Sequence, residues 1–212
     1  MQAQKSKQIS LKGSTAVVTD FFKFAINTIL YQRGVYPADD FHLVKKYGQT
    51  VMLTEDAALI NYLDKILKQV NEWLLKGNVT QLVLVLLSKD TRTPLERWVF
   101  TVDIIRSDDE SIPLDDAKPD ADIQKEIRHI IKQIVASVTF LPLVYEPMVF
   151  NILVYTRDSA DVPEKEWLDT DPLAIEASMS QQVKLRSFST DYHRIGAMVD
   201  YRYDPVPSVA EK

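Results

Sequence analysis

The stretch from Asp120 to Leu141 has an amphipathic pattern that the rest of the chain must cover. Six apolar side chains recur at helical spacing and therefore share one face: Ile123, Ile127, Ile130, Ile131, Ile134 and Val138. Pro119 with Asp120 or Asp122 is a start signal, and Pro142 ends the helix because proline cannot continue it. A helix of about 20 residues is about 30 Å long, so we expect it to cross a whole domain core.

Three basic residues, Lys125, Arg128 and Lys132, line up beside this apolar stripe, on a face turned away from the expected core. One interpretation is a solvated flank that keeps the helix soluble. The other is an electrostatic docking surface. The pattern alone leaves both open.

Length and composition restrict the class of protein. The 212 residues, 46% hydrophobic and 26% charged, suit one globular domain over residues 1–212. A net charge of −5 argues against a nucleic-acid partner, which requires basic surface. The chain has no cysteine, which excludes disulfides and thiolate metal sites. Without a long apolar run or signal peptide, we expect no membrane anchor.

Two further helices are predicted before the central one. Residues 15–33 are apolar on most of the circumference, which is typical of a helix buried on more than one side, and Ser14 is the expected cap. Residues 41–53 have a weak pattern and are expected to be irregular. Thr54 is the expected cap of the second helix, and Gly77 its terminator.

Strand patterns occupy most of the remaining chain. Leu82–Leu87 is a continuous apolar run, typical of a strand covered on both faces, and the alternation around Trp98–Ile104 completes a hairpin. Further strands are predicted at Met148–Thr156, Gln182–Ser187 and Arg194–Tyr203, with a turn at Ser189–His193. The predicted fold class is α+β, with three helices packed on a mainly antiparallel sheet.

The segment from Arg157 to Ser180 is acidic and has no clear periodicity. Segments of this length without secondary structure are usually functional or disordered, and strand patterns resume after it, so we interpret it as a strap over the domain. Trp167 lies within it, where a large aromatic side chain is either a contact residue or a liability. Ser107–Pro119, acidic and proline-containing, is expected to be a solvated loop.

No pattern indicates catalysis or a cofactor. The chain lacks the glycine-rich phosphate loops and the nucleophile motif of hydrolases. His42, His129 and His193 are scattered without metal-ligand spacing. Thr93-Pro94 matches a proline-directed phosphorylation site, but a turn is the simpler interpretation. We therefore expect that the chain is not an enzyme and binds neither a cofactor nor a metal ion.

Five motifs occur in order: ISLKGS (residues 9–14), FFKFAINTILYQRGVYP (21–37), LERWVF (95–100), SVTFLP (137–142) and VKLRSFST (183–190). Together they closely resemble the checkpoint branch of the HORMA-domain family over residues 9–203. The resemblance implies a conformational switch with open and closed forms. It also implies a core of about residues 9–156 and a mobile C-terminal safety belt, about 157–212, that encloses a partner peptide. The sequence does not say which form is present.

The same resemblance implies the partners and the location. The expected partners are a Mad-one-type kinetochore receptor and the activator subunit of the anaphase-promoting complex. Another copy of the chain in the other conformer is also expected, as is an AAA+ remodelling ATPase with a HORMA-type adaptor. The expected locations are the nucleus and kinetochore, and also the cytoplasm.

The resemblance also assigns residues. The conformer dimer interface would include Arg128, Lys132, Gln133 and Phe140, where Lys132 replaces the usual arginine and loses its planar fork. The peptide would add as a strand beside residues 148–155, with Phe150, Ile152, Val154, Tyr155 and Trp167 as the peptide-binding residues. Ile9 and Leu11 would belong to an N-terminal segment that rearranges as the belt moves.

Two alternatives remain beside the checkpoint switch. One is an enzyme with a dispersed active site. The other is a HORMA-domain peptide-binding adaptor in another pathway, such as the meiotic chromosome axis or translesion synthesis. The LYQRGVYP and LRSFST motifs favour the checkpoint branch.

Overall fold

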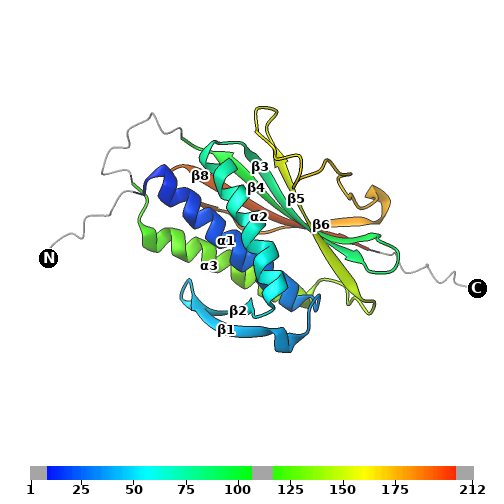
Figure 1. Ribbon diagram of the computed structural model, residues 1–212. Coiled ribbons are helices and arrows are strands. Elements are labelled where there is room, and N and C mark those ends of the chain that lie inside the picture. Colours follow the sequence, from blue (N-terminus) through cyan, green and yellow to red (C-terminus); the bar gives the residue numbers. More distant parts are fainter. Residues whose placement is uncertain (1–8, 107–116, 204–212) are drawn as a thin grey trace, which may run out of the picture.

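The computed structural model describes residues 9–106 and 117–203. Its helices are α1 (Leu11–Gln32), α2 (Ala57–Leu75) and α3 (Asp120–Ala136), and its strands are β1 (Phe41–Lys46), β2 (Gln49–Thr54), β3 (Val79–Ser88), β4 (Pro94–Ile104), β5 (Met148–Thr156), β6 (Ser180–Lys184), β7 (Phe188–Ser189) and β8 (His193–Arg202). The three helices cover one face of a six-stranded sheet (Figure 1). The predicted α+β architecture is confirmed, and every pairing between the described strands is antiparallel.

The sheet runs in the order β5-β3-β4-β8-β6, with β7 also paired to β8. Residues Leu82–Leu87 of β3 are buried on both faces, as predicted from their continuous apolar run. Leu82, Leu84 and Leu86 belong to the main core under the helices, whereas Val83, Val85 and Leu87 form a second cluster on the opposite face. That second face is important for the site, because a later part of the chain covers it.

Helix α1 lies in the middle of the molecule, between α2, α3 and the sheet. This position explains why its sequence is apolar nearly all round. Phe21 packs edge-on against Phe100 of β4 and Phe188 of β7, with ring centroids 5.5 and 4.9 Å apart. The helix therefore connects the central strands to the C-terminal part of the sheet.

Several predicted helix boundaries were wrong. The cap of α2 is Asp56, whose carboxylate accepts from the Leu59 amide at 2.6 Å, and not Thr54. No side chain caps α3, whose N-cap position is Pro119, and the helix ends at Ala136. Val138 therefore lies in the following 3₁₀ turn and is 41% exposed, outside the buried stripe. Gly77 has a φ of +67° and ends α2 as predicted.

Residues 41–53 were expected to be irregular and are instead the β1–β2 hairpin, a separate two-stranded sheet. Its turn places Tyr47 and Gly48 at φ +51° and +67°. The guanidinium of Arg128 on α3 packs so closely on Gly48 that a Cβ there would lie 2.8 Å from it. The Tyr47 hydroxyl donates to Asp20 of α1 at 2.6 Å. The hairpin is thus attached to both α1 and α3.

The C-terminal strands also differ in position from the prediction. β6 begins and ends earlier than the predicted strand at residues 182–187, and β7 occupies the start of the predicted turn at Ser189–His193. The alternation of Ile195, Ala197, Val199 and Tyr201 in β8 is confirmed, since all four side chains are buried. Most of the predicted loop at residues 107–119 lies outside the described residues. None of the described helices is long and apolar enough to cross a membrane.

Candidate functional site

Strand β5 lies at an edge of the six-stranded sheet. Among the described residues it pairs with β3 and with no other strand, so one side of its backbone lacks a strand partner. A free edge presents amide and carbonyl groups at the spacing that another extended strand requires. β5 is therefore a candidate acceptor for an added strand.

The side chains predicted to contact a peptide lie on both faces of β5. Phe150, Ile152 and Val154 belong to the main core under the helices, and the Phe150 ring lies 5.7 Å from that of Tyr62 on α2. Tyr155 packs on the opposite face of the sheet. An added strand would therefore meet the backbone of β5 first, and these side chains at its margins.

The chain after β5 is attached to α2. The Trp73 indole N–H donates to the carbonyl oxygen of Asp161 at 2.9 Å. Trp167 packs edge-on against Trp73, with ring centroids 4.9 Å apart and planes at 62°. Lys65 and Glu166 form an ion pair at 3.4 Å. Trp167 is thus a contact residue, and its contact in this structure is with α2 of the same chain.

A pocket of about 390 Å³ lies between α2, β5 and this attached segment. It is lined by Tyr62, Lys65, Ile66, Asn151, Ile152, Leu153, Glu166, Trp167, Leu168 and Thr170. The pocket adjoins the middle of the free edge. Its walls combine apolar rings with a few charged and amide groups, a composition suited to an extended peptide.

Beyond the pocket the segment crosses the face of the sheet that the helices leave open. Leu173 packs there against the second apolar cluster, as Val149, Tyr155 and Met198 also do. In Figure 1 this part of the chain, yellow to orange, lies on the side of the sheet away from the helices. The segment 157–179 therefore runs from the β5 edge to β6 at the opposite edge, as a strap would.

The C-terminal end of the strap is fixed by the pairing of β8 with β4. The register extends without a break from Glu96–Tyr201 to Ile104–His193. β6 and β7 both pair with β8 and depend on its position. The chain after β5 is consequently held at two places: Asp161 and Trp167 contact α2, and β8 pairs with β4.

The N-terminal residues Ile9 and Leu11, expected in a segment that rearranges, are not part of a strand here. Leu11 is the first residue of α1, and Ser10 is the cap, with its hydroxyl accepting from the Gly13 amide at 3.1 Å. Ile9 packs on the main core. The predicted cap, Ser14, was wrong because the helix begins a turn earlier.

Ser14 instead joins α1 to the C-terminal strands. Its hydroxyl lies 2.6 Å from the Thr190 hydroxyl and 2.7 Å from Nδ1 of His193. All three residues are buried. Burial lowers the pKa of His193, although a hydrogen bond to the backbone of Leu74 opposes this effect. The neutral imidazole is therefore the form that this cluster favours.

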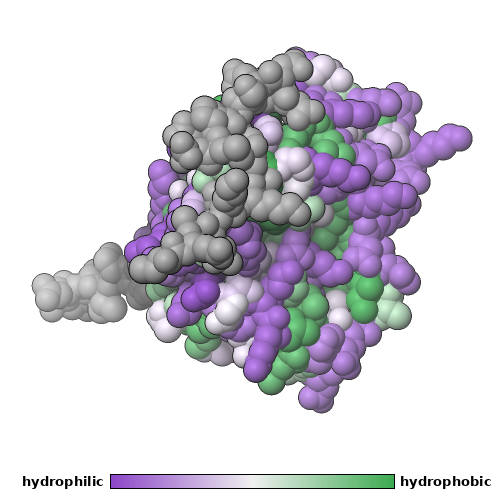
Figure 2. Space-filling model, turned by 90° about the vertical axis from the view of Figure 1, so that its left-hand side faces the viewer, coloured by the Kyte–Doolittle hydropathy of each residue, from purple (hydrophilic) through white to green (hydrophobic). Residues whose placement is uncertain are grey.

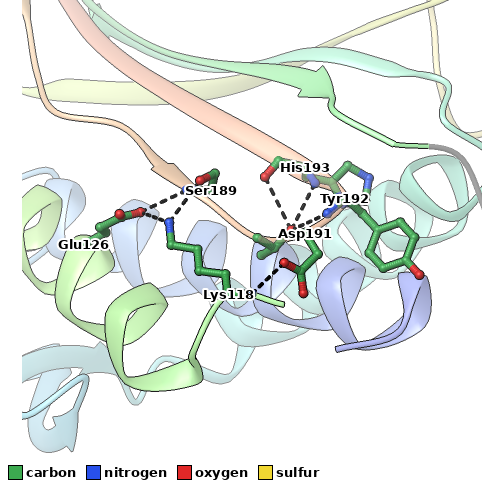
Figure 3. Close-up of polar contacts among 7 residues, drawn as sticks. Lys118, Glu126, Ser189, Asp191, Tyr192 and His193 are labelled. Carbon is green, nitrogen blue, oxygen red and sulfur yellow. Dashed lines mark hydrogen bonds and ion pairs between the residues drawn. The ribbon is translucent and has the colours of Figure 1, made fainter. Parts of the chain in front are cut away.

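A second cluster of polar residues joins α3 and Lys118, which precedes it, to the same strands (Figure 3). Lys118 Nζ lies 2.6 Å from the carboxylate of Glu126 and donates to the Ser189 hydroxyl at 2.9 Å. The Ser189 amide donates to Glu126 at 3.1 Å, and the Lys118 amide to Asp191 at 2.9 Å. The position of the C-terminal strands is thus fixed from α1 and α3 by hydrogen bonds as well as by packing.

The four residues predicted for the conformer dimer have two different environments. Lys132 is exposed, and Phe140 is 43% exposed. Arg128 donates to the carbonyl oxygen of Tyr47 at 2.6 Å, and Gln133 accepts from the Arg186 amide at 2.7 Å. Lys132 and Phe140 are thus available to a partner, whereas Arg128 and Gln133 make contacts within the chain.

Sequence reasoning missed a buried ion pair between Arg33 and Glu96. Their side chains are 5% and 2% exposed, and a guanidinium nitrogen lies 2.5 Å from a carboxylate oxygen. The Trp98 indole donates to Glu96 at 3.0 Å, and Arg33 donates to the Pro142 carbonyl oxygen at 2.7 Å. Burial raises the pKa of Glu96, while Arg33 opposes that shift. The available signal was the charged residues within two motifs rich in large apolar and aromatic side chains, Arg33 in YQRGVYP and Glu96 in LERWVF.

The histidines do not meet in space as a metal site would require. His42 pairs with Glu55 at 3.2 Å, His129 faces Arg186, and His193 is in the buried cluster. Within residues 9–106 and 117–203, no group of three His, Asp or Glu side chains is placed to hold a metal ion.

Comparison with known proteins gives the family. The HORMA domain model matches residues 14–193, so the chain belongs to the HORMA-domain family. It is 50% identical to the mitotic spindle assembly checkpoint protein MAD2A of Dictyostelium discoideum, over 92% of this chain and 93% of that protein. It is 42% identical to the human protein of the same name, over 95% and 97%.

The fold gives the same result. A chain in the crystal structure of the mitotic checkpoint complex superposes with a TM-score of 0.81 at 40% identity, covering 90% of this chain and 99% of that one. The expected HORMA fold and the expected relationship to the checkpoint branch are both confirmed.

Proposed function

We propose that the chain acts in the mitotic spindle assembly checkpoint as a switch that captures a short peptide of a partner protein, and that it acts by binding rather than catalysis. The observation that supports this most directly is the free edge of β5 beside a pocket beneath residues 157–179. The checkpoint relatives support the pathway.

In this proposal the peptide adds as a strand to β5. Backbone hydrogen bonds supply affinity independent of sequence, and the pocket selects side chains. Phe150, Ile152, Val154 and Tyr155 shape the margins of the edge, and Trp167 holds the strap over it. The strap, in the sense of the safety belt at about residues 157–212, encloses the peptide because it is held at both ends.

We assign the arrangement described here to the closed form. The C-terminal strands lie on β4 and the strap passes over the outer face of the sheet. Opening then requires β8 to leave β4, which breaks the contacts of Ser14 with Thr190 and His193. Ile9 and Leu11, at the start of α1, become the rearranging segment in the same step.

The partners proposed are those of a checkpoint switch. A Mad-one-type kinetochore receptor and the activator subunit of the anaphase-promoting complex would supply the peptides. An AAA+ remodelling ATPase with a HORMA-type adaptor would return the closed form to the open one. The nucleus, the kinetochore and the cytoplasm are the corresponding locations. The structural relative from the mitotic checkpoint complex supports partners that are proteins.

The second proposed contact is with another copy of the chain in the open form. Lys132 and Phe140 are exposed on and after α3, and Val135 at 40% and Val138 at 41% exposure extend this surface. Arg128 and Gln133 would act by holding the β1–β2 turn and residue 186 in place beside it.

Calorimetric titration with a receptor peptide tests the capture site. Trp167→Ala removes the ring that packs on Trp73 and should cost about 1.5 kcal/mol, or about tenfold in affinity. The control is Leu143→Ala, an exposed apolar residue outside the pocket lining. Unchanged affinity in Trp167→Ala would refute the role of the strap. Failure to retain a Mad-one-type receptor from extract would favour the meiotic or translesion alternative.

A further inference from the structure

Strand β5 has an unusual composition for a strand at the edge of a sheet. Such strands commonly carry charged side chains or proline, which prevent pairing with a wrong strand. Hydrophilic side chains separate the apolar patches at the end of the molecule shown in Figure 2. The β5 sequence, MVFNILVYT, has neither a charged residue nor a proline, and Asn151 is the polar residue near its centre. The interactions of Asn151 are therefore important for this edge.

The register with β3 determines which backbone groups of β5 face the free edge. Directly before the strand, the Lys89 amide donates to the Pro147 carbonyl oxygen at 2.8 Å, so these two residues form a hydrogen-bonded pair. In an antiparallel ladder such pairs alternate with pairs that are not hydrogen-bonded, and the register from Pro147 onward has no shift before Tyr155. Residues such as Asn151 therefore bond to β3, whereas Phe150, Ile152 and Val154 direct their amides to the free edge.

The Ile152 amide has a hydrogen-bond acceptor although no strand is added at this edge. The side-chain oxygen of Asn151 accepts from it at 3.0 Å. Ile152 and Leu153 are the buried residues of β5, at 5% and 7% exposure, and an amide without an acceptor is costly where water has little access. Asparagine side chains compete with sheet hydrogen bonds by bonding to a nearby backbone group in this way. Asn151 thus takes the place that a carbonyl of an added strand would have.

Asn151 is also placed to meet a captured peptide. Its neighbours at alternate positions, Val149 and Leu153, belong to the outer apolar face of the sheet, so Asn151 lies on that face beneath the strap. Its side chain lines the pocket between α2, β5 and the strap. An added strand requires the Ile152 amide as a donor, and one N–H group cannot donate fully to two acceptors. The Asn151 oxygen must therefore leave this amide before a peptide can pair along the whole of β5.

We propose that Asn151 is an autoinhibitory edge cap, which occupies the Ile152 amide in the empty chain and is displaced by a backbone carbonyl of the captured peptide. This inference rests on the proposed function and adds a competitor that is built into the peptide site. The edge cap stabilises the empty edge and weakens the binding of every peptide by the net value of one hydrogen bond, about fivefold in affinity. A captured strand must compensate for this loss with its other contacts.

The direct test is amide hydrogen exchange in the full chain without peptide, followed residue by residue by NMR. After correction for intrinsic rates, Ile152 should exchange about fivefold more slowly than Phe150 and Val154, whose amides face the same edge. Asn151→Ala should abolish this difference. Asn151→Asp keeps an acceptor oxygen and should retain it.

Two results of this measurement overturn the edge cap. One is exchange of Ile152 as fast as that of Phe150 and Val154 in the unsubstituted chain, which needs no variant. The other is equal protection of Ile152 in the unsubstituted chain and in Asn151→Ala. The amides of β3 that bond to β5 show in the same spectra whether each variant is folded.

Peptide affinity is a second readout, and its direction separates inhibition from a merely structural role. The probe is a short peptide that the unsubstituted chain selects from a random library displayed on phage. Asn151→Ala should bind this peptide about fivefold more tightly in calorimetric titration, because no edge cap has to be displaced. The matched control is Val149→Ala, which removes an apolar side chain from the same face and should bind no more tightly. Equal or weaker binding by Asn151→Ala overturns the inhibitory role.

The two measurements also separate this proposal from the function on which it rests. If the unsubstituted chain selects no peptide, the proposed function fails together with the displacement step, and hydrogen exchange alone decides whether Asn151 protects the edge. If peptides bind, but Asn151→Ala changes neither the exchange of Ile152 nor the affinity, the edge cap is overturned and peptide capture stands.

Discussion

Removing the charge of Glu96 should destabilise the fold by a large fraction of its total stability. Glu96→Gln keeps the shape of the side chain, but Arg33, only 5% exposed, is left in the interior without a counter-ion. Losing one partner of a buried ion pair costs about 3–5 kcal/mol, against a total stability of about 5–15 kcal/mol for a domain. The variant should therefore fold, with a much lower midpoint of urea unfolding followed by circular dichroism.

The matched variants make this prediction sharper. Arg33→Met leaves the Glu96 carboxylate unpaired and should cost a similar amount. With both substitutions neither charge of this pair remains, and the main loss is the hydrogen bond to the Pro142 carbonyl oxygen, about 1–3 kcal/mol. We therefore expect the double variant to be more stable than either single variant. Losses that simply add, to about 6–10 kcal/mol, would refute the reasoning.

Three further predictions concern single positions. Lys132→Glu should change the free energy of unfolding by less than about 0.5 kcal/mol and weaken self-association at least tenfold by sedimentation; an intact dimer would exclude Lys132 from the interface. Because the pKa of His193 is lowered in the folded chain, the unfolded chain binds more protons below pH about 6.5, and the free energy of unfolding should fall on acidification. The fall should be less steep in His193→Gln. Equal slopes of stability against pH in the two chains would contradict this. Gly48→Ala should lower stability by about 1–2 kcal/mol in thermal unfolding, since φ is +67° and Arg128 is in contact; no change would refute the close packing.

The sequence was sufficient to predict elements whose burial follows one simple period. β3 and β5 are apolar over their length or alternate cleanly, and both were predicted correctly. The α3 stripe was correct from Ile123 to Ile134, where the helix packs on the core. The prediction that Val138 belongs to this stripe was wrong because the helix ends at Ala136. Helical spacing beyond that residue no longer places a side chain on the buried face.

The β1–β2 hairpin could not be predicted by the same reasoning. It packs on α1 and α3 as a separate two-stranded sheet and buries only a few of its side chains, so no strong alternation is needed. The Arg33–Glu96 pair was also outside the pattern, because the two residues are 63 positions apart and meet only through the fold. Contacts between segments that are distant in the sequence do not produce a periodic pattern in either segment.

Among the site residues, the strand at β5 was predicted from its own pattern, and Trp167 from its unusual surroundings. The partner of Trp167 could not be predicted, since Trp73 lies on α2, far from Trp167 in the sequence. The roles of Arg128, Lys132, Gln133 and Phe140 came from resemblance to a family. The structure adds which of these side chains are exposed and which make contacts within the chain.

Capture of a peptide by release and return of the C-terminal strands is tested most directly by fastening β8 to β4. Asp103 and Arg194 are exposed partners across these strands, and the chain has no other cysteine, so Asp103→Cys/Arg194→Cys offers one disulfide. If the disulfide is formed before the peptide is added, the chain should fail to capture the peptide. If it is formed afterwards, the chain should fail to release the peptide. Reduction of the disulfide should restore both capture and release. If the oxidised chain binds and releases peptide at the rates of the reduced chain, the strap does not enclose the peptide.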